Sequence, residues 1–592
     1  MRAHVVMAAA AVGALVGLPV PWWLAASGCI GTLALALAGR LGGRRGGVWA
    51  VVVMFLVTSA SALHATRSLD FPAADEFDGW VTLVDDPRTS GPVGVRVTVR
   101  ADRRRLVASA HGAVAGRLDD ALAGERVRLV GTIRPVAADD ERSIQRHIVG
   151  RITVTAVLDA ADAAPVAAGA NAIRRTLAGG AASLTRDDRS LFLGMVMGDD
   201  RGQGPVVADD FRAAGLGHLL VVSGQNVAFV LAVAMPVAGR MRPAGRATLL
   251  MVVLGLFAVM TRFEPSVLRA TAMAGVGIGS TALGRPTDGR AGLSWAVAGL
   301  LVIDPFLVHS IAFRLSAAAT AGIVWLGGPL GERLPGPGWL RVPIATTVAA
   351  QLAVSPVLIA VFGPIPLASL PANVLAGPAS GAVMIWGCTA GLVAGVFGGV
   401  VATVVHWPTQ ALLWWISSVA RGAAAAPSAR LGGPELIALS MAALAAVGVR
   451  RYRVGVLSGL VSVVVCASAA FATPRLPIGS TVLGNGVTVV HGQGGTVVVL
   501  DDPGPARLVL ERLRLAGVRR PVLVIATDGD RADADAVLAL TERFGPLPIA
   551  APPLHRVPGA RTVTAGRVLV AGTIRVVILE SDPEIVFSAG SA

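Results

Sequence analysis

Long apolar segments recur along this chain, and they constrain its fold more than any other feature. A helix that crosses a membrane needs about 20 mainly apolar residues, and about twelve segments approach that length. Only 15% of the residues are charged, against about 25% in a typical soluble protein, so an ordinary soluble enzyme is excluded. We therefore expect a polytopic α-helical membrane protein with about 12 spans. The candidate spans are Val5–Val20, Trp22–Ala38, Val48–Leu63, 219–238, 247–261, 266–283, 293–303, 311–326, 343–362, two or three within 367–420, 436–449 and 454–471.

The polar residues gather in two parts of the chain and divide it by composition. Residues 1–64 are apolar, 65–165 are polar, 218–473 are again mostly apolar, and 474–592 are polar. Residues 166–217 are intermediate, and we predict amphipathic helices at the membrane interface there, because four apolar residues share one helical face. These residues are Leu191, Phe192, Met195 and Val196.

The net charge of +14 belongs to the apolar parts of the chain. The two polar parts together contain 26 Arg and 26 Asp or Glu residues, so their net charge is zero. An excess of Arg in short loops is typical of the cytoplasmic side of a membrane. This predicts a multi-pass protein of the cell membrane with both polar parts outside, although the side of 474–592 depends on whether 367–420 crosses twice or three times. The clearest basic loops contain Arg240, Arg242 and Arg246, then Arg285 and Arg290, then Arg333 and Arg341.

Residues 65–165 contain five short segments that are typical of β-strands. Five strands in about a hundred residues predict a small barrel, and we expect an OB-like β domain. Such barrels bind single-stranded nucleic acid beside a basic groove, so a basic run at a predicted hairpin is a candidate DNA contact; a solvated turn is the alternative. The run consists of Arg100, Arg103, Arg104 and Arg105. The predicted strands are Trp80–Val84, Val93–Val99, Leu106–Ala110, Glu125–Ile133 and Ile152–Leu158.

Polar side chains stand at the start of the span that begins near residue 219. They are His218, Ser223, Gln225 and Asn226. Polar groups in a membrane span are costly unless they face protein or water. This position is therefore a candidate functional site.

These residues and several later motifs resemble the ComEC family, the inner-membrane DNA channel of natural competence. The segment 217–227 is similar to the family signature at His218, Ser223, Gly224 and Val227, with Asn226 where histidine is usual. The order of barrel, membrane core and C-terminal α/β part also matches, so the resemblance covers nearly the full chain. Later matches, in order, are Pro265-Ser266 with Arg269-Ala270, Asp304-Pro305, Phe313–Ser316 with Arg314 replacing Gln, Gln351, Pro356, Phe362-Gly363, and Leu370–Pro378 with Asn373.

The resemblance implies transport of single-stranded transforming DNA across the cytoplasmic membrane, with a DNA-receptor protein outside and a helicase-type motor inside. Arg269 and Arg314 would offer cations to DNA phosphates, and Glu264 would neutralise Arg269. Alternatively, the amide side chains hold helices together through interhelical hydrogen bonds. The candidate pathway residues are His218, Ser223, Gln225, Asn226, Glu264, Arg269, Arg314, Gln351 and Asn373.

Residues 474–592 mix strands with two helices, an α/β pattern, and resemble a truncated metallo-β-lactamase-like domain. At the metal motif both histidines are replaced, by Ala526 and Arg531, and zinc hydrolases need imidazoles. We therefore expect no metal, no cofactor and no enzymatic activity. The acids that remain form a solvated loop or, alternatively, hold Mg²⁺: Asp528, Asp530, Asp533 and Asp535. The predicted strands are Thr481–Val482, Val487–Val490, Thr496–Leu500, Val522–Ala526, Arg567–Val570 and Ile574–Leu579, and the helices are Pro505–Ala516 and Ala532–Phe544.

Two other functions stay open at this point. A secondary transporter for a smaller anionic solute would use the same intramembrane Arg and amide residues, although no inverted repeat is visible. A membrane-anchored hydrolase with an external C-terminal domain is disfavoured by the missing histidines.

Overall fold

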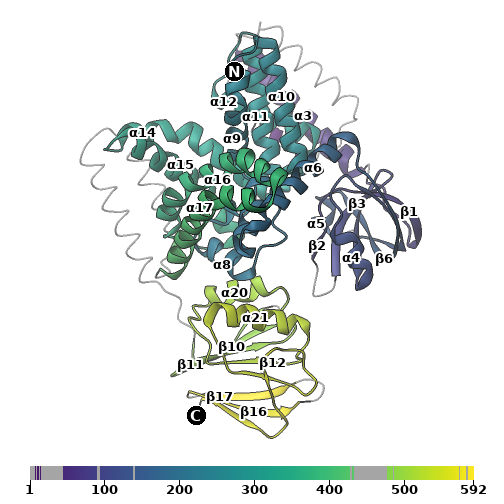
Figure 1. Cartoon of the computed structure of the whole chain (residues 1–592), viewed down its shortest axis with the longest axis vertical. Helices are drawn as coiled ribbons and strands as arrows, with labels where there is room; N and C mark the ends of the chain where they lie inside the picture. The colour runs from purple at the N-terminus through teal and green to yellow at the C-terminus, as the bar shows by residue number, and fades with distance from the viewer. Residues whose placement is uncertain are drawn as a thin grey trace.

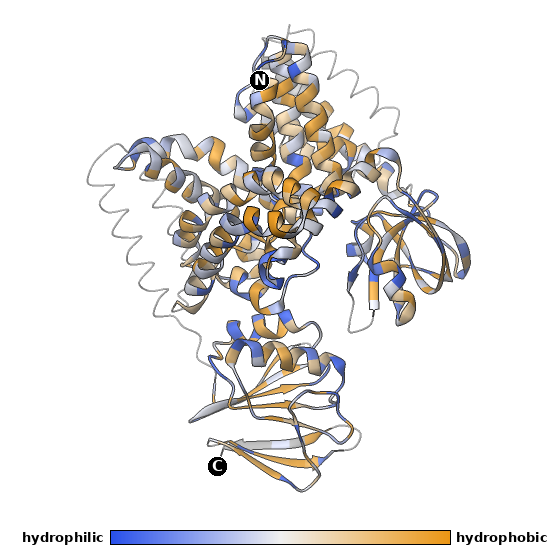
Figure 2. Ribbon diagram, viewed as in Figure 1, coloured by the Kyte–Doolittle hydropathy of each residue, from blue (hydrophilic) through white to orange (hydrophobic). Residues whose placement is uncertain are grey.

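The computed structural model describes residues 7, 10, 11, 14, 44–67, 69–89, 94–137, 140–426, 430–431, 477–484, 486–572, 574–581 and 585–591. Helices form the centre of the molecule, a curved β-sheet lies at their side, and an α/β part lies at one end (Figure 1). Apolar residues run along the central helices and also along the strands of both β-rich parts (Figure 2).

The five strands predicted within residues 65–165 are all present. The sheet has the order β1-β5-β6-β4-β3-β2, and β1 also pairs with β3 at Thr82–Arg100 and Leu83–Val99. Its core consists of side chains that alternate inward along the strands, as in Val95, Val97 and Val99. The elements are β1 Asp75–Leu83, β2 Arg88–Thr89, β3 Gly94–Ala101, β4 Arg104–His111, α4 Ala113–Asp119, β5 Arg126–Pro135, α5 Glu141–Ile144 and β6 Ile148–Ala161.

The central part is helical, and its segments follow the predicted apolar pattern. The helices are α3 Arg44–Arg67, α6 Pro165–Gly180, α7 Arg186–Met197, α8 Pro205–Ala213, α9 Gly224–Ala238, α10 Pro243–Met260, α11 Pro265–Ala282, α12 Gly289–Ile303, α13 Ile311–Gly322, α14 Gly328–Arg333, α15 Gly338–Phe362, α16 Ser369–Phe397 and α17 Gly399–Ala425. The short helices are η1 Ala181–Ser183, η2 Gly217–Leu219, η3 Pro305–His309 and η4 Ile323–Gly327. Residues 367–420, where two or three spans were expected, form the two helices α16 and α17.

Within the described residues, four helical segments are long and apolar enough to cross a membrane. Three shorter apolar helices accompany them, and together they support a membrane protein. The predicted spans Trp22–Ala38, 436–449 and 454–471, and most of Val5–Val20, lie outside the described residues, so the total number of spans stays a prediction. The four long segments are Pro243–Met260, Ile311–Arg333, Gly338–Phe362 and Ser369–Phe397, and the shorter ones are Val53–Thr66, Gly224–Ala238 and Gly289–Ile303.

The apolar face of α7, predicted to lie at the membrane interface, is buried within the protein. Phe192 is 0% exposed and sits against α16 at Gly387 and Gly391, where a Cβ atom would lie 3.0 and 3.2 Å from its ring. These glycines allow α7 and α16 to approach closely. Leu191, Phe192, Met195 and Val196 therefore contact protein rather than lipid.

The C-terminal α/β part has two sheets and two helices. The larger sheet has the order β14-β13-β12-β11-β10-β9, with parallel pairing from β11 to β14. Helices α20 and α21 pack on one face, and the second sheet packs on the other. The predicted strands and helices all occur, and β13, β14 and β17 were not predicted. The elements are β9 Gly479–Gly484, β10 Val487–Gly492, β11 Gly495–Leu500, α20 Ala506–Leu515, β12 Leu523–Ala526, α21 Arg531–Phe544, β13 Ile549–Ala551, β14 Arg561–Thr562, β15 Val568–Ala571, β16 Ile574–Glu580 and β17 Val586–Ser591.

Candidate functional site

The predicted pathway residues belong to helices that contact one another in a closed order. Helix α9 packs against α11, α11 against α13, α13 against α15, α15 against α16, and α16 against α9. We name these five helices the helix ring. Each ring helix contains at least one predicted residue: Gln225 and Asn226 on α9, Arg269 on α11, Arg314 on α13, Gln351 on α15 and Asn373 on α16.

The start of α9 is fixed to its neighbours by hydrogen bonds. Asn226 is buried, and its Nδ2 donates to the Met195 carbonyl oxygen on α7 at 2.7 Å. Ser223 Oγ lies 3.3 Å from Asn226 Oδ1, to which it donates. His218 and Gln225 are exposed, and they share a narrow cleft with Ser223 and Asn226. Asn226 therefore holds α9 to α7, while His218 and Gln225 line the cleft beside it.

Arg269 is a buried cation at the junction of three ring helices. It is 6% exposed, and its Nε donates to Ser316 Oγ on α13 at 2.8 Å. A Cβ atom at Gly224 on α9 would lie 2.3 Å from Arg269 Nη2, so any larger residue there would displace the guanidinium. Among the described residues, no carboxylate lies within ion-pair distance of Arg269.

The prediction that Glu264 neutralises Arg269 is wrong. Glu264 precedes the first residue of α11, and the charges that act on it are those of Arg88, Asp200 and Asp85. These residues lie toward the curved sheet. The direction of the Glu264 side chain could not be read from its spacing to Arg269, because the chain turns sharply before α11.

The remaining predicted residues are exposed or form hydrogen bonds within their own helix. Arg314 is exposed, so it is not the buried cation that its place within a span suggested. Gln351 Nε2 lies 3.5 Å from Ser355 Oγ, and Asn373 Nδ2 donates to the Ser369 carbonyl oxygen at 2.7 Å. Both contacts stay within one helix, so these amides do not join helices through them. Their part in a pathway stays a prediction.

A buried ionic cluster, which the sequence did not reveal, joins the curved sheet to the central helices. The Asp86 carboxylate, just after β1, accepts Arg174 Nη2 from α6 at 2.6 Å and Arg262 Nη2 from the α10–α11 loop at 2.8 Å. We name these three residues the docking triad. Burial raises the pKa of Asp86, but the charges of Arg174 and Arg262 outweigh it, so the pKa lies below its ordinary value.

The backbone of the α10–α11 loop is shaped for this contact. Arg262 and Phe263 have φ angles of 58° and 54°, a left-handed conformation that is costly for residues with side chains. The loop persists because Arg262 is held by Asp86 and by Asn171 Oδ1 at 2.9 Å. In the sequence these residues are isolated charges with no motif, so only their position in space identifies them.

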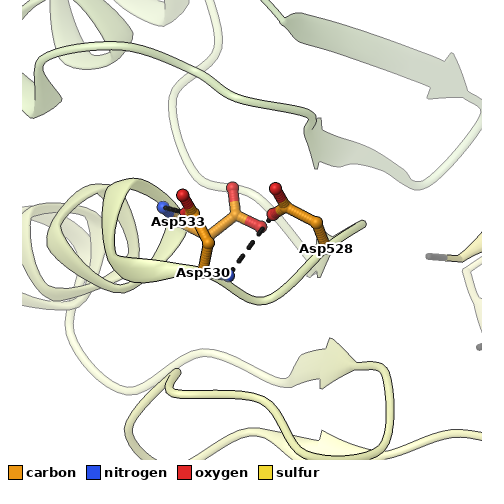
Figure 3. A group of neighbouring side chains, drawn as sticks. All are labelled: Asp528, Asp530 and Asp533. Carbon is orange, nitrogen blue, oxygen red and sulfur yellow. Dashed lines mark hydrogen bonds between the residues drawn. The ribbon is translucent and has the colours of Figure 1, made fainter. Parts of the chain in front are cut away.

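Three acidic side chains gather at the carboxyl end of β12. Asp528, Asp530 and Asp533 offer oxygen atoms that all lie within 4.8 Å of one another (Figure 3). Asp530 Oδ1 accepts from the Asp533 amide at 2.9 Å and begins α21. Asp533 is fully buried. Burial, followed by the adjacent Asp528 carboxyl, raises the pKa of Asp533 to about 9.

This acidic group does not fit the zinc centre of a metallo-β-lactamase-like fold. Zinc hydrolases use imidazoles together with carboxylates, and this group, as far as the described residues go, contains carboxylates alone. Asp533, whose pKa is raised to about 9, would have to lose its proton before it could bind a metal. The Mg²⁺ alternative stays a prediction.

Comparison with known proteins identifies a family for the central part of the chain. Residues 195–453 match the family model described as competence protein. This region of the chain is therefore similar to the competence protein family. It contains every helix of the ring and each predicted pathway residue from His218 to Asn373, but neither β-rich part.

Two curated proteins are each similar to about a third of this chain. The uncharacterized protein YcaI of Escherichia coli K12 is 29% identical over 213 residues, which cover 32% of this chain and 27% of YcaI. ComE operon protein 3 of Bacillus subtilis 168 is 24% identical over 211 residues, which cover 35% of this chain and 27% of that protein. The alignments thus span about a quarter of each relative. No solved structure matches the chain.

Proposed function

We propose that this protein conducts single-stranded transforming DNA across the cytoplasmic membrane through the helix ring. The observation that carries the proposal is Arg269, a buried cation at the junction of α9, α11 and α13 without a carboxylate partner in the described part of the chain. A cation in apolar surroundings is costly unless it meets an anion or water. DNA phosphates passing through the ring would supply that anion one after another.

The curved sheet would stand on the outer side of the membrane as an OB-type domain. Its strand order, the additional β1–β3 pairing and the helix α4 between β4 and β5 support this fold. The docking triad holds it at the end of α10 and the start of α11. The basic loops at Arg240–Arg246 and Arg285–Arg290 lie at the other ends of α10 and α11, where the excess of Arg favours the cytoplasm.

The C-terminal part would be a metallo-β-lactamase-like domain without hydrolytic activity. The replaced histidines at Ala526 and Arg531 support this. It contacts the helices through Arg514 Nε, 3.0 Å from Asp209 Oδ1 on α8, and through Arg543, which pairs with Asp210. A receptor outside the cell and a helicase-type motor inside would deliver and pull the strand.

Uptake of labelled DNA tests the proposal in a naturally competent host that lacks its own channel. We expect the wild-type chain to restore uptake into the cytoplasm and transformation, and Arg269→Ala to abolish most of both. Arg246→Ala is the matched control, because it removes an exposed cation from the first turn of α10, a helix outside the ring. Arg269→Lys keeps the charge and is expected to retain part of the activity.

Equal uptake by Arg269→Ala and Arg246→Ala, at matched protein levels in the membrane, would refute this role of the ring. A small anion could use the same buried cation. If Arg269→Ala reduced the uptake of small anionic solutes but left DNA uptake unchanged, the result would favour a secondary transporter instead.

A further inference from the structure

A basic cavity lies at one end of the curved sheet, at the turn between β3 and β4. It has a volume of about 430 Å³, within the range of sites that bind small molecules. Its walls come from the hairpin, from the chain just before β1 and from the start of β6. The lining residues are Leu69, Asp70, Arg100, Asp102, Arg103, Arg104, Arg105, His147 and Val149.

The cavity gathers four arginines and two aspartates, Asp70 and Asp102, so its lining carries an excess of positive charge. Arg100 and Arg105 are direct cross-strand partners on β3 and β4, an arrangement of like charges that destabilises a sheet. Burial and then the charge of Arg100 lower the pKa of Arg105. Arg104 pairs with Asp70 at 2.7 Å, whereas no carboxylate in the described part of the chain pairs with Arg100, Arg103 or Arg105. An anion between these arginines would relieve the repulsion.

The cavity lies at the level where two apolar helices end. Leu69 follows the last residue of α3 by two positions, and α3 contains the apolar segment Val53–Thr66. On the other wall, His147 Nε2 lies 3.2 Å from Asp304 Oδ1, and Asp304 directly follows α12. The last residue of α12, Ile303, is 81% exposed. A charged cavity beside exposed apolar surface at the ends of two such helices matches the headgroup layer of a membrane.

The surroundings of the cavity favour lipid over DNA. Helix α3 packs against α12 and η3, and none of these three belongs to the helix ring. The cavity therefore lies next to helices that are not part of the ring that contains Arg269.

We propose that this cavity binds the phosphate of an anionic glycerophospholipid whose acyl chains lie along α3 and α12. Arg100, Arg103 and Arg105 donate charge-assisted hydrogen bonds to the phosphodiester oxygens. The bound lipid would anchor the curved sheet at the membrane surface. This role does not depend on whether the ring conducts DNA.

Binding to the purified full chain in a neutral detergent tests the proposal. A soluble short-chain phosphatidylglycerol is titrated against wild type, Arg100→Gln/Arg105→Gln and the control Arg96→Gln/Arg134→Gln, and occupancy is measured by native mass spectrometry. The control removes two exposed arginines from the same sheet, away from the cavity. We expect the affinity to fall about tenfold or more in the first variant and to stay unchanged in the control.

Displacement of the bound phosphatidylglycerol from the wild-type protein by other compounds tests the proposal even where a variant folds poorly. Short-chain phosphatidylcholine and inorganic phosphate are expected to displace the lipid weakly, and an oligonucleotide of about twelve residues is expected not to displace it. Inorganic phosphate that binds as tightly as the lipid would make this a free-phosphate site and overturn the proposal. Displacement by the oligonucleotide at lower concentration than phosphatidylglycerol would overturn it in favour of DNA, and equal binding by both double variants would also refute it.

Discussion

Asp86→Ala tests whether the docking triad fixes the curved sheet to the helices. Arg174 is 2% exposed, and the substitution removes its nearest carboxylate, at 2.6 Å. Breaking a buried ion pair costs about 3–5 kcal/mol, because the remaining charge is left buried. Arg174 Nη1 keeps the carbonyl oxygens of Met197 and Met260, and Asp199 lies 3.6 Å away. Because these partners remain, we expect Asp86→Ala to lower the free energy of unfolding by about 3 kcal/mol, the lower end of that range.

The assay is thermal unfolding of the full chain in detergent, combined with hydrogen exchange of residues 79–89 and 261–268. We expect a lower melting temperature and faster exchange in both segments. Asp78→Ala is the control, since it removes the same charge from the same sheet but breaks only the exposed pair with Arg128. Exposed pairs contribute little, so the control should match wild type.

The pKa of Asp86 also predicts how the effect of Asp86→Ala on stability changes with pH. Because the pKa of Asp86 lies below its ordinary value, its contribution is complete above about pH 4 and is lost as the pH falls through the lower folded value. The difference between wild type and Asp86→Ala should therefore be constant from about pH 5 to 8 and shrink in acid. Equal stability of Asp86→Ala and Asp78→Ala, or a difference that grows in acid, would refute the reasoning.

Two further substitutions test the ring and the acidic group. Gly224→Ala would place a Cβ 2.3 Å from Arg269 Nη2, so we expect DNA uptake to fall at least tenfold, whereas Gly255→Ala on α10, with open space around it, should leave uptake unchanged; equal uptake by both would contradict the packing described. Asp533→Asn mimics the protonated acid. The pKa of Asp533 is about 9 in the folded protein, against an ordinary value near 4. The wild-type protein therefore loses stability as the pH rises from about 4 to about 9, on the order of 4 kcal/mol by pH 7. The variant should thus gain stability at pH 8 and change little at pH 4 in thermal unfolding, and stabilisation of wild type alone by Mg²⁺ would instead show that Asp533 and Asp528 hold a metal.

Features that depend on periodicity were predictable from the sequence. The strands of the curved sheet alternate inward and outward residues, so Val95, Val97 and Val99 marked β3 directly. The apolar helices were equally predictable, because they carry apolar side chains on most faces. The motifs also identified Arg269 and Asn226 as candidate site residues, and both are buried in the structure.

Features that depend on contacts between distant segments were not predictable. Asp86, Arg174 and Arg262 are far apart in the chain, and an isolated charge carries no sign of its partner. Glu264 and Arg269 show the converse, since their spacing suggested an ion pair that the turn before α11 does not allow. The apolar face of α7 resembled a membrane-binding surface because the glycines of α16 that receive it lie almost 200 residues away.

The most direct measurement of the central claim is contact between the helix ring and DNA during uptake. A photoreactive side chain is placed at Gln225, which is exposed at the start of α9, or at Trp414 on α17, which is 64% exposed and lies outside the ring. Cells taking up labelled DNA are then illuminated. We expect the label to attach at position 225 and not at position 414. Equal labelling at both positions, or none at position 225 while uptake continues, would contradict conduction of DNA through the ring.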